Sequence, residues 1–116
     1  MGFIFHSIKS MEKPSWFQAD LKRYYTLKCV RVSIRSTKIV EDSFFKDVEF
    51  RFGNESMEGD ISLNHIIGFS AGHQDAVEGV VVEYCMEYPL VGRFLILREM
   101  GDYSNLVFGE IQVTVV

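Results

Sequence analysis

Hydrophobic and polar residues alternate along several short segments of the chain, the pattern of β-strands that bury one face. In residues 25–35, Val30, Val32 and Ile34 alternate with charged or hydroxyl-bearing side chains, which predicts a long strand. Alternation of this kind, or enrichment in valine, isoleucine and phenylalanine, predicts strands at residues 25–35, 45–52, 80–85, 93–98 and 106–116. No segment carries a sustained apolar stripe at helical spacing.

Polar, glycine-bearing stretches separate these runs and predict turns. Residues 57–78 are the least regular part and predict a short strand and a long loop. Trp16 is the single tryptophan of a small chain, so we expect it in the core or as an anchor at a strand edge. Evenly spaced strands with turns between them favour an all-β antiparallel sandwich or jelly roll, and residues 1–116 hold no repeat or linker that would divide one domain.

Charge and hydropathy exclude two classes of partner. The net charge of −4 argues against nucleic-acid binding, which needs a basic face. No apolar run approaches the roughly 20 residues of a membrane span. The apolar residues 1–6 are too short for the core of a signal peptide, so we expect a mature form, a fragment or a cytosolic chain. The sequon Asn54-Glu55-Ser56 favours secretion.

Candidate chemistry is sparse. The two cysteines, Cys29 and Cys85, are compatible with one disulfide or with two buried free thiols. His65 and His73 lack the spacing of metal ligands. No residues are spaced as a nucleophile with its base, so we predict a binding module and not an enzyme.

Several segments, taken in order, are similar to one family. Trp16, Asp20 and Leu21 form a Trp-x-x-x-Asp-Leu segment before the first long strand. Later segments are Gly92-Arg93-Phe94 after Cys85, and Leu106-x-x-x-Glu110-Ile111-x-Val113 at the end. Over roughly residues 5–116 the chain resembles the F-type (fucose-binding) lectins of the discoidin and coagulation-factor C-domain superfamily. The resemblance implies an antiparallel jelly-roll β-sandwich, here without the family's first strand, with a sugar pocket among loops at one end.

The resemblance also implies a sugar site, with changes. In the family a His and two Arg side chains bind fucose; His6 lies near the His position and Arg35 on the first Arg. The second Arg position is Phe44, and the Gly-Asp that normally follows the first Arg is absent. We predict that His6, Arg35 and Lys38 donate hydrogen bonds to sugar hydroxyls and that Phe44 supplies an apolar wall.

Two other family features are altered. The usual partner of Cys85 falls near Leu63 or Asn64, so the resemblance favours an unpaired Cys85. Of the family's calcium ligands only Glu110 is matched, because the loop that supplies most of them would precede residue 1. Calcium takes six to eight oxygens, so we predict no calcium site and no other cofactor.

Two functions follow from this resemblance. One is a non-catalytic, extracellular carbohydrate-binding module of altered or weakened fucose-type specificity, with a glycan or glycoprotein as partner. The other is a degenerate lectin scaffold that serves as a protein–protein interaction or structural module. In either case the missing first strand would expose a sheet edge, and we predict self-association through it.

Overall fold

The computed structural model describes residues 1–10, 15–33, 47–70, 81–101 and 106–116, with the backbone alone described in 6–10 and 106–108. The described residues form seven strands and one short 3-10 helix. These elements are β1 (Gly2–Ser10), β2 (Trp16–Ser33), β3 (Val48–Gly53), η1 (Ile61–Leu63), β4 (His65–Ser70), β5 (Val81–Cys85), β6 (Val91–Glu99) and β7 (Leu106–Val115).

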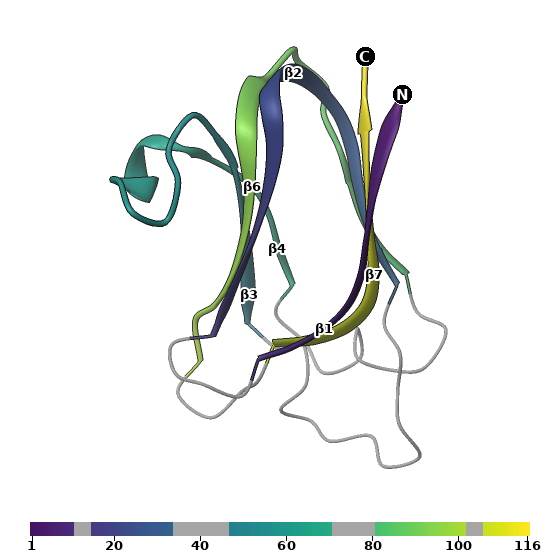
Figure 1. The fold of residues 1–116 in the computed structure, drawn as a ribbon, viewed down its shortest axis with the longest axis vertical. Coiled ribbons are helices and arrows are strands. Elements are labelled where there is room, and N and C mark those ends of the chain that lie inside the picture. Colours follow the sequence, from purple (N-terminus) through teal and green to yellow (C-terminus); the bar gives the residue numbers. More distant parts are fainter. Residues whose placement is uncertain (11–14, 34–46, 71–80, 102–105) are drawn as a thin grey trace.

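The strands form two layers, and β2 belongs to both (Figure 1). The last part of β2, from Leu27, pairs with β7 and β5, and β1 pairs with β7, which makes sheet A. The first part of β2 pairs with β6, followed by β3 and then β4, which makes sheet B. Every described pair is antiparallel, so the predicted jelly-roll β-sandwich is confirmed.

Buried residues follow the predicted alternation. Val30 and Val32 of sheet A are fully buried, as are Val48, Phe50 and Phe52 of sheet B. They meet in one core, where the rings of Phe50 and Tyr84 lie edge to face with centroids 4.9 Å apart. These parts of β2 and β3 therefore contribute every second side chain to the space between the sheets.

Two side chains show what the alternation does not report. Glu49 alternates with the core residues Val48 and Phe50, yet it is buried, because Arg51 Nε and Arg98 Nη2 donate to its Oε1 at 2.6 and 3.1 Å. Of the two positions expected for Trp16, the structure has the strand edge and not the core: 43% of it is exposed, and it begins β2 opposite Arg98 at the edge of sheet B. The predicted strand positions Ile34, Phe45 and Val80 lie outside the described residues.

The strand predicted at residues 25–35 is longer than expected, because β2 starts at Trp16 and bends between the two sheets. Its pairing with β6 shifts register between Asp20 and Tyr25, and Lys22 between them has a left-handed φ of 71°. Asp20 Oδ1 accepts hydrogen bonds from the Lys22 backbone N–H at 2.8 Å and from Arg93 Nε at 2.7 Å, and Arg93 Nη2 donates to Oδ2 at 2.9 Å. Asp20 thus fixes the bend and ties it to β6.

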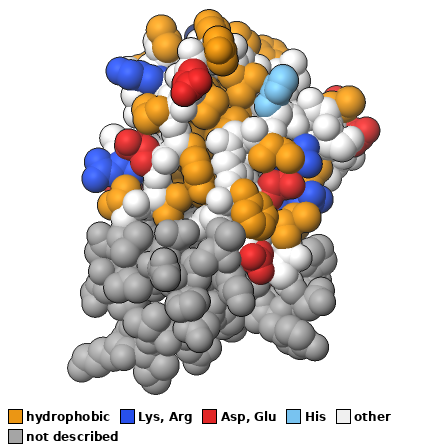
Figure 2. Space-filling view, turned by 180° about the vertical axis from the view of Figure 1, so that it is seen from behind, with side chains coloured by type: hydrophobic (Ala, Val, Ile, Leu, Met, Phe, Trp, Pro, Cys, Tyr) orange, Lys and Arg blue, Asp and Glu red, His pale blue; other side chains and the backbone are white. Residues whose placement is uncertain are grey.

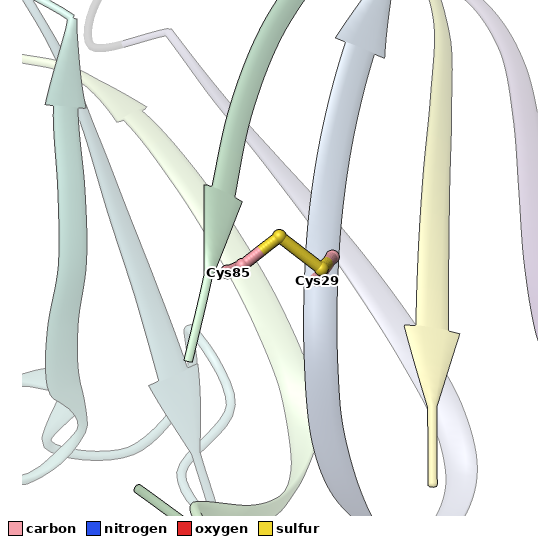
Figure 3. The surroundings of a disulfide bond; sticks show 2 residues. All are labelled: Cys29 and Cys85. Atoms are coloured by element: carbon pink, nitrogen blue, oxygen red, sulfur yellow. A yellow bond between two sulfur atoms is a disulfide. The ribbon is translucent and has the colours of Figure 1, made fainter. Parts of the chain in front are cut away.

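The two cysteines are bonded to each other, which corrects the expectation of an unpaired Cys85 (Figure 3). The pairing of β2 with β5 places Cys29 directly opposite Cys85, with their Cα atoms 4.1 Å apart. In the family the partner of the cysteine at the Cys85 position falls near Leu63 and Asn64. These two residues lie in the connection between β3 and β4, and neither is a cysteine. Strand register therefore decides the partner.

Replacing Asp20 with Asn tests the bend. The hydrogen bonds from Arg93 hold the pKa of the Asp20 carboxyl well below its usual range. Because the pKa is lower in the folded chain, this stabilisation is fully present above the unfolded pKa of about 4 and is lost as the pH falls through the folded pKa. We expect Asp20→Asn to lower the free energy of unfolding by about 1 kcal/mol at pH 7, measured by urea denaturation, and the deficit to shrink below pH 4.

Asp60→Asn is the matched control for this substitution. Asp60 is exposed and accepts hydrogen bonds only within its own turn, from the backbone N–H and hydroxyl of Ser62, at 3.1 and 2.5 Å. We expect a much smaller loss from this control at pH 7. Equal losses in the two variants would contradict the role given to Asp20.

Removing the disulfide tests the Cys29–Cys85 bond. The bonded cysteines are 56 positions apart, so the bond restricts a large loop of the unfolded chain. We expect Cys29→Ala/Cys85→Ala to lower the free energy of unfolding by about 4 kcal/mol, and either single substitution to cost about as much as the pair. Dithiothreitol should lower the urea midpoint of the unsubstituted chain and leave that of the double variant unchanged; a reductant-insensitive midpoint would refute the bond.

Candidate functional site

The described residues that bear on the predicted sugar site belong to sheet A. In β1, His6 pairs with Glu110 of β7, and Glu110 pairs in turn with Ser33 of β2. Ser33 is the last described residue before Arg35. Because neighbouring strands lie about 4.8 Å apart, the backbones of His6 and Ser33 are roughly 10 Å apart in one row.

The contacts that this site would make stay predictions. Arg35, Lys38 and Phe44 lie outside the described residues, and of His6 only the backbone is described. Glu110, the one residue matched to the family's calcium ligands, is the β7 partner of His6 in the sheet. Among the described residues, no group of three or more His, Cys, Asp or Glu side chains is arranged to hold a metal ion.

A second candidate site lies where the two sheets meet along the edge strands β4 and β5. A groove of about 470 Å³ opens between the start of β4 and the connection that follows β5. We call it the seam groove; it is lined by His65, Ile66, Ile67, Cys85, Met86, Glu87, Tyr88, Pro89 and Leu90. Figure 2 shows the face on which β4 and β5 lie, and hydrophobic side chains gather over its upper part beside a histidine.

One wall of the seam groove is the connection 86–90, and it is held at both ends. The Met86 backbone N–H donates to the Lys28 carbonyl at 2.9 Å, and the Leu27 N–H donates to the Leu90 carbonyl at 2.9 Å. The disulfide fixes Cys85 immediately before this connection. Tyr88 is thus carried on a short segment attached to β2 at each end, although 79% of the residue is exposed.

The other wall begins at His65 and is positioned by its neighbour Asn64. The buried Asn64 amide donates from Nδ2 to the Glu55 carbonyl at 2.8 Å and accepts from the Glu55 N–H at 3.0 Å. Arg51 Nη1 donates to the Asn64 carbonyl at 2.9 Å. A Cβ at Gly53 would collide with the Asn64 side chain, so the absence of a side chain at Gly53 allows this packing.

A smaller hollow of about 270 Å³ adjoins the seam groove and shares His65 and Leu90 with it. Asn54, Glu55 and Leu63 are among the other residues of its lining. The two hollows together combine exposed apolar side chains with hydrogen-bonding groups. That mixture is typical of sites that bind small polar molecules.

Sequence reasoning missed the seam groove. The region 57–78 has little periodicity, and the connection 86–90 reads only as a turn marked by Pro89. The one local signal is a tyrosine inside that turn, where polar residues are usual. Assembly of the groove depends on two edge strands from different sheets, which no local pattern reports.

The sequence matches no protein-family model and no curated protein. Solved structures do match. The chain superposes on a fucolectin from striped bass (Morone saxatilis) serum with a TM-score of 0.73 and 19% identity, covering 97% of this chain and 36% of the fucolectin chain. It therefore spans about a third of that chain's length.

Two bacterial modules have the same fold. A family 32 carbohydrate-binding module of Clostridium perfringens, solved in complex with galactose, matches at a TM-score of 0.63 and 11% identity over 86% of this chain and 66% of that one. A chitosan-binding module from a chitosanase/glucanase of Paenibacillus sp. IK-5 matches at 0.59 and 10% over 93% and 74%. These likenesses confirm the lectin-type fold expected from the resemblance. Among the described residues, no helix is long and apolar enough to cross a membrane.

Replacing Gly53 with Ala tests how the His65 wall is held. The added Cβ would press on the buried Asn64 amide, so we expect the free energy of unfolding to fall by about 2 kcal/mol, measured by urea denaturation. Gly59→Ala is the control, because the one close approach of its Cβ would be to the carboxylate of Glu55, the far end of a flexible side chain, while the Ser56 carbonyl would lie at an ordinary contact distance of 3.6 Å. Similar effects at both glycines would contradict the proposed packing.

Proposed function

We propose that the chain is a non-catalytic carbohydrate-binding module whose partner is a glycan or a glycoprotein. The observation that carries this proposal is the match of nearly the whole chain to a fucolectin, supported by the same fold in modules described as binding galactose and chitosan. One fold can bind different ligands, and the residues of the binding site determine which ligand is bound. The specificity of this chain must therefore be argued from its site residues.

For the primary site we propose the loop end of sheet A. His6 and Arg35 would donate hydrogen bonds to sugar hydroxyls, Lys38 would add a charged donor, and Phe44 would contact the apolar face of the ring. Phe44 stands where the family has an arginine, and phenylalanine cannot donate. The proposal is therefore a module of altered or weakened fucose-type specificity.

An extracellular location fits two features of the described chain. The Cys29–Cys85 disulfide is the kind of bond that persists in oxidising compartments. Asn54, the first residue of the sequon, is exposed immediately after β3, as glycosylation of its side chain would require.

A second candidate function is a protein-interaction module on the same scaffold. Leu63, Ile66 and Val91 are each more than half exposed and line the two adjoining hollows. Exposed apolar side chains in a cluster mark surfaces that contact other molecules. Self-association through a sheet edge stays a prediction; β1 and β5 are the outer strands of sheet A, and β4 is an outer strand of sheet B.

Glycan binding by Arg35 variants tests the proposed function. A glycan array followed by calorimetric titration with fucosylated oligosaccharides should show saturable binding. We expect Arg35→Ala to weaken binding at least tenfold, since loss of charge-assisted hydrogen bonds removes about 1.4 kcal/mol or more.

Arg23→Ala is the matched control for the Arg35 substitution. Arg23 is exposed at the bend in the middle of β2, well before Ser33 in the strand, and its substitution should leave the affinity unchanged. Absence of binding to any glycan at millimolar concentration, or equal affinity of the Arg35→Ala variant, would overturn the proposed site.

A further inference from the structure

We propose that the seam groove is a second saccharide site, which binds an uncharged sugar ring and rejects acidic sugars. It goes beyond the loop-end site because it uses different residues at a different place. Ser33, which leads to Arg35, pairs with Val81 at the start of β5, whereas the groove adjoins Cys85 at the end of β5. The two positions are roughly 13 Å apart along the strand.

The size of the seam groove suits a single sugar unit or a short chain end. Its volume of about 470 Å³ lies within the range of small-molecule pockets, roughly 300–1,000 Å³. Its floor is apolar, because Ile67, Met86 and Leu90 are partly buried against the core. A ligand seated there would contact a surface that the folded chain already holds in place.

Tyr88 supplies an aromatic face for stacking. Its ring is exposed to solvent, yet both ends of its segment are hydrogen-bonded to the backbone of β2. Pro89 further restricts the backbone beside it. Because the backbone on both sides of Tyr88 is already fixed, a ligand has to order only its side chain, and the ring face complements the C–H groups of a pyranose. Ile66, which is 57% exposed, extends the apolar surface on the facing wall.

His65 and Glu87 supply the directional contacts. They lie on the two opposite walls of the groove, one at the start of β4 and one in the connection 86–90. A carboxylate accepts hydrogen bonds from two neighbouring hydroxyls, and an imidazole both donates and accepts. Polar groups on both sides of an apolar floor match the alternation of hydroxyls and C–H faces on a sugar ring.

Charge decides which sugars fit. The lining residues include the carboxylate of Glu87 and no lysine or arginine, and Glu55 lines the adjoining hollow. A uronate or another acidic sugar would bring a second negative charge beside Glu87 with no cation in the lining to neutralise it. An uncharged hexose meets no such cost.

Nitrogen–proton NMR titration of the whole chain tests the seam groove. The probes are methyl β-galactopyranoside, methyl α-fucopyranoside and methyl β-glucuronide. We expect saturable shifts of the His65, Ile66, Glu87 and Tyr88 amides with at least one neutral glycoside, and affinity for the glucuronide at least tenfold weaker. Tyr88→Ala should weaken neutral-sugar binding at least tenfold, while Tyr88→Phe should retain most of it because the ring face remains.

Tyr24→Ala is the control, because Tyr24 is 61% exposed and lines neither hollow; it should bind as the unsubstituted chain does. Shifts confined to the residues around Ser33 and Glu110 would overturn the seam groove and leave the proposed function standing. Shifts confined to the residues of the seam groove would overturn the loop-end site and support the seam groove. No shift with either neutral glycoside, or glucuronide binding equal to theirs, would overturn this inference.

Discussion

The passage of β2 from one sheet to the other is the constraint on which the rest of the structure depends. A strand that pairs with β6 at its start and with β7 and β5 at its end must turn sharply between them. The turn places Lys22 in a left-handed conformation, which costs a non-glycine residue on the order of 1 kcal/mol. Asp20 offsets that cost by accepting the Lys22 N–H and by binding Arg93 of β6 through two hydrogen bonds. The buried Leu21 and Leu27, one on each side of the bend, then reach the same core.

The same strand organises the seam groove. Past the bend, Leu27 and Lys28 hold the two ends of the connection 86–90 by backbone hydrogen bonds, and Cys29 holds the end of β5 covalently. The wall that carries Tyr88 is therefore attached to the central element of the sandwich. Binding groups on short segments supported by a rigid scaffold are the usual way in which β-sandwich domains carry function.

The outer face of sheet B contrasts with the groove. There Glu49 binds Arg51 and Arg98, so its charge is satisfied within the fold. Arg51 also reaches the Asn64 carbonyl and so secures the segment beside His65. The charges of Glu49, Arg51 and Arg98 are already paired with one another, so we assign this cluster a role in supporting the seam groove and not in binding a ligand. The groove instead leaves Tyr88 and Ile66 exposed, and these are the side chains that we propose contact a sugar.

The sequence by itself determined the fold class, the positions of β3, β5, β6, β7 and the second half of β2, and most of the core, whereas β1 and the first half of β2 were not predicted. Alternation at Val30, Val32, Phe50 and Phe52 is a local property, because side chains along a strand point to opposite faces whatever the strand pairs with. The order of the family-like segments gave the jelly roll.

Only the tertiary structure decided the partner of Cys29, the burial of Glu49 and the existence of the seam groove. Each depends on which strands lie side by side and in what register. Alternation along one strand carries no record of its neighbours. A disulfide, a buried ion pair and a groove between two edge strands all join residues distant in the sequence, so they become visible only once the sheets are assembled.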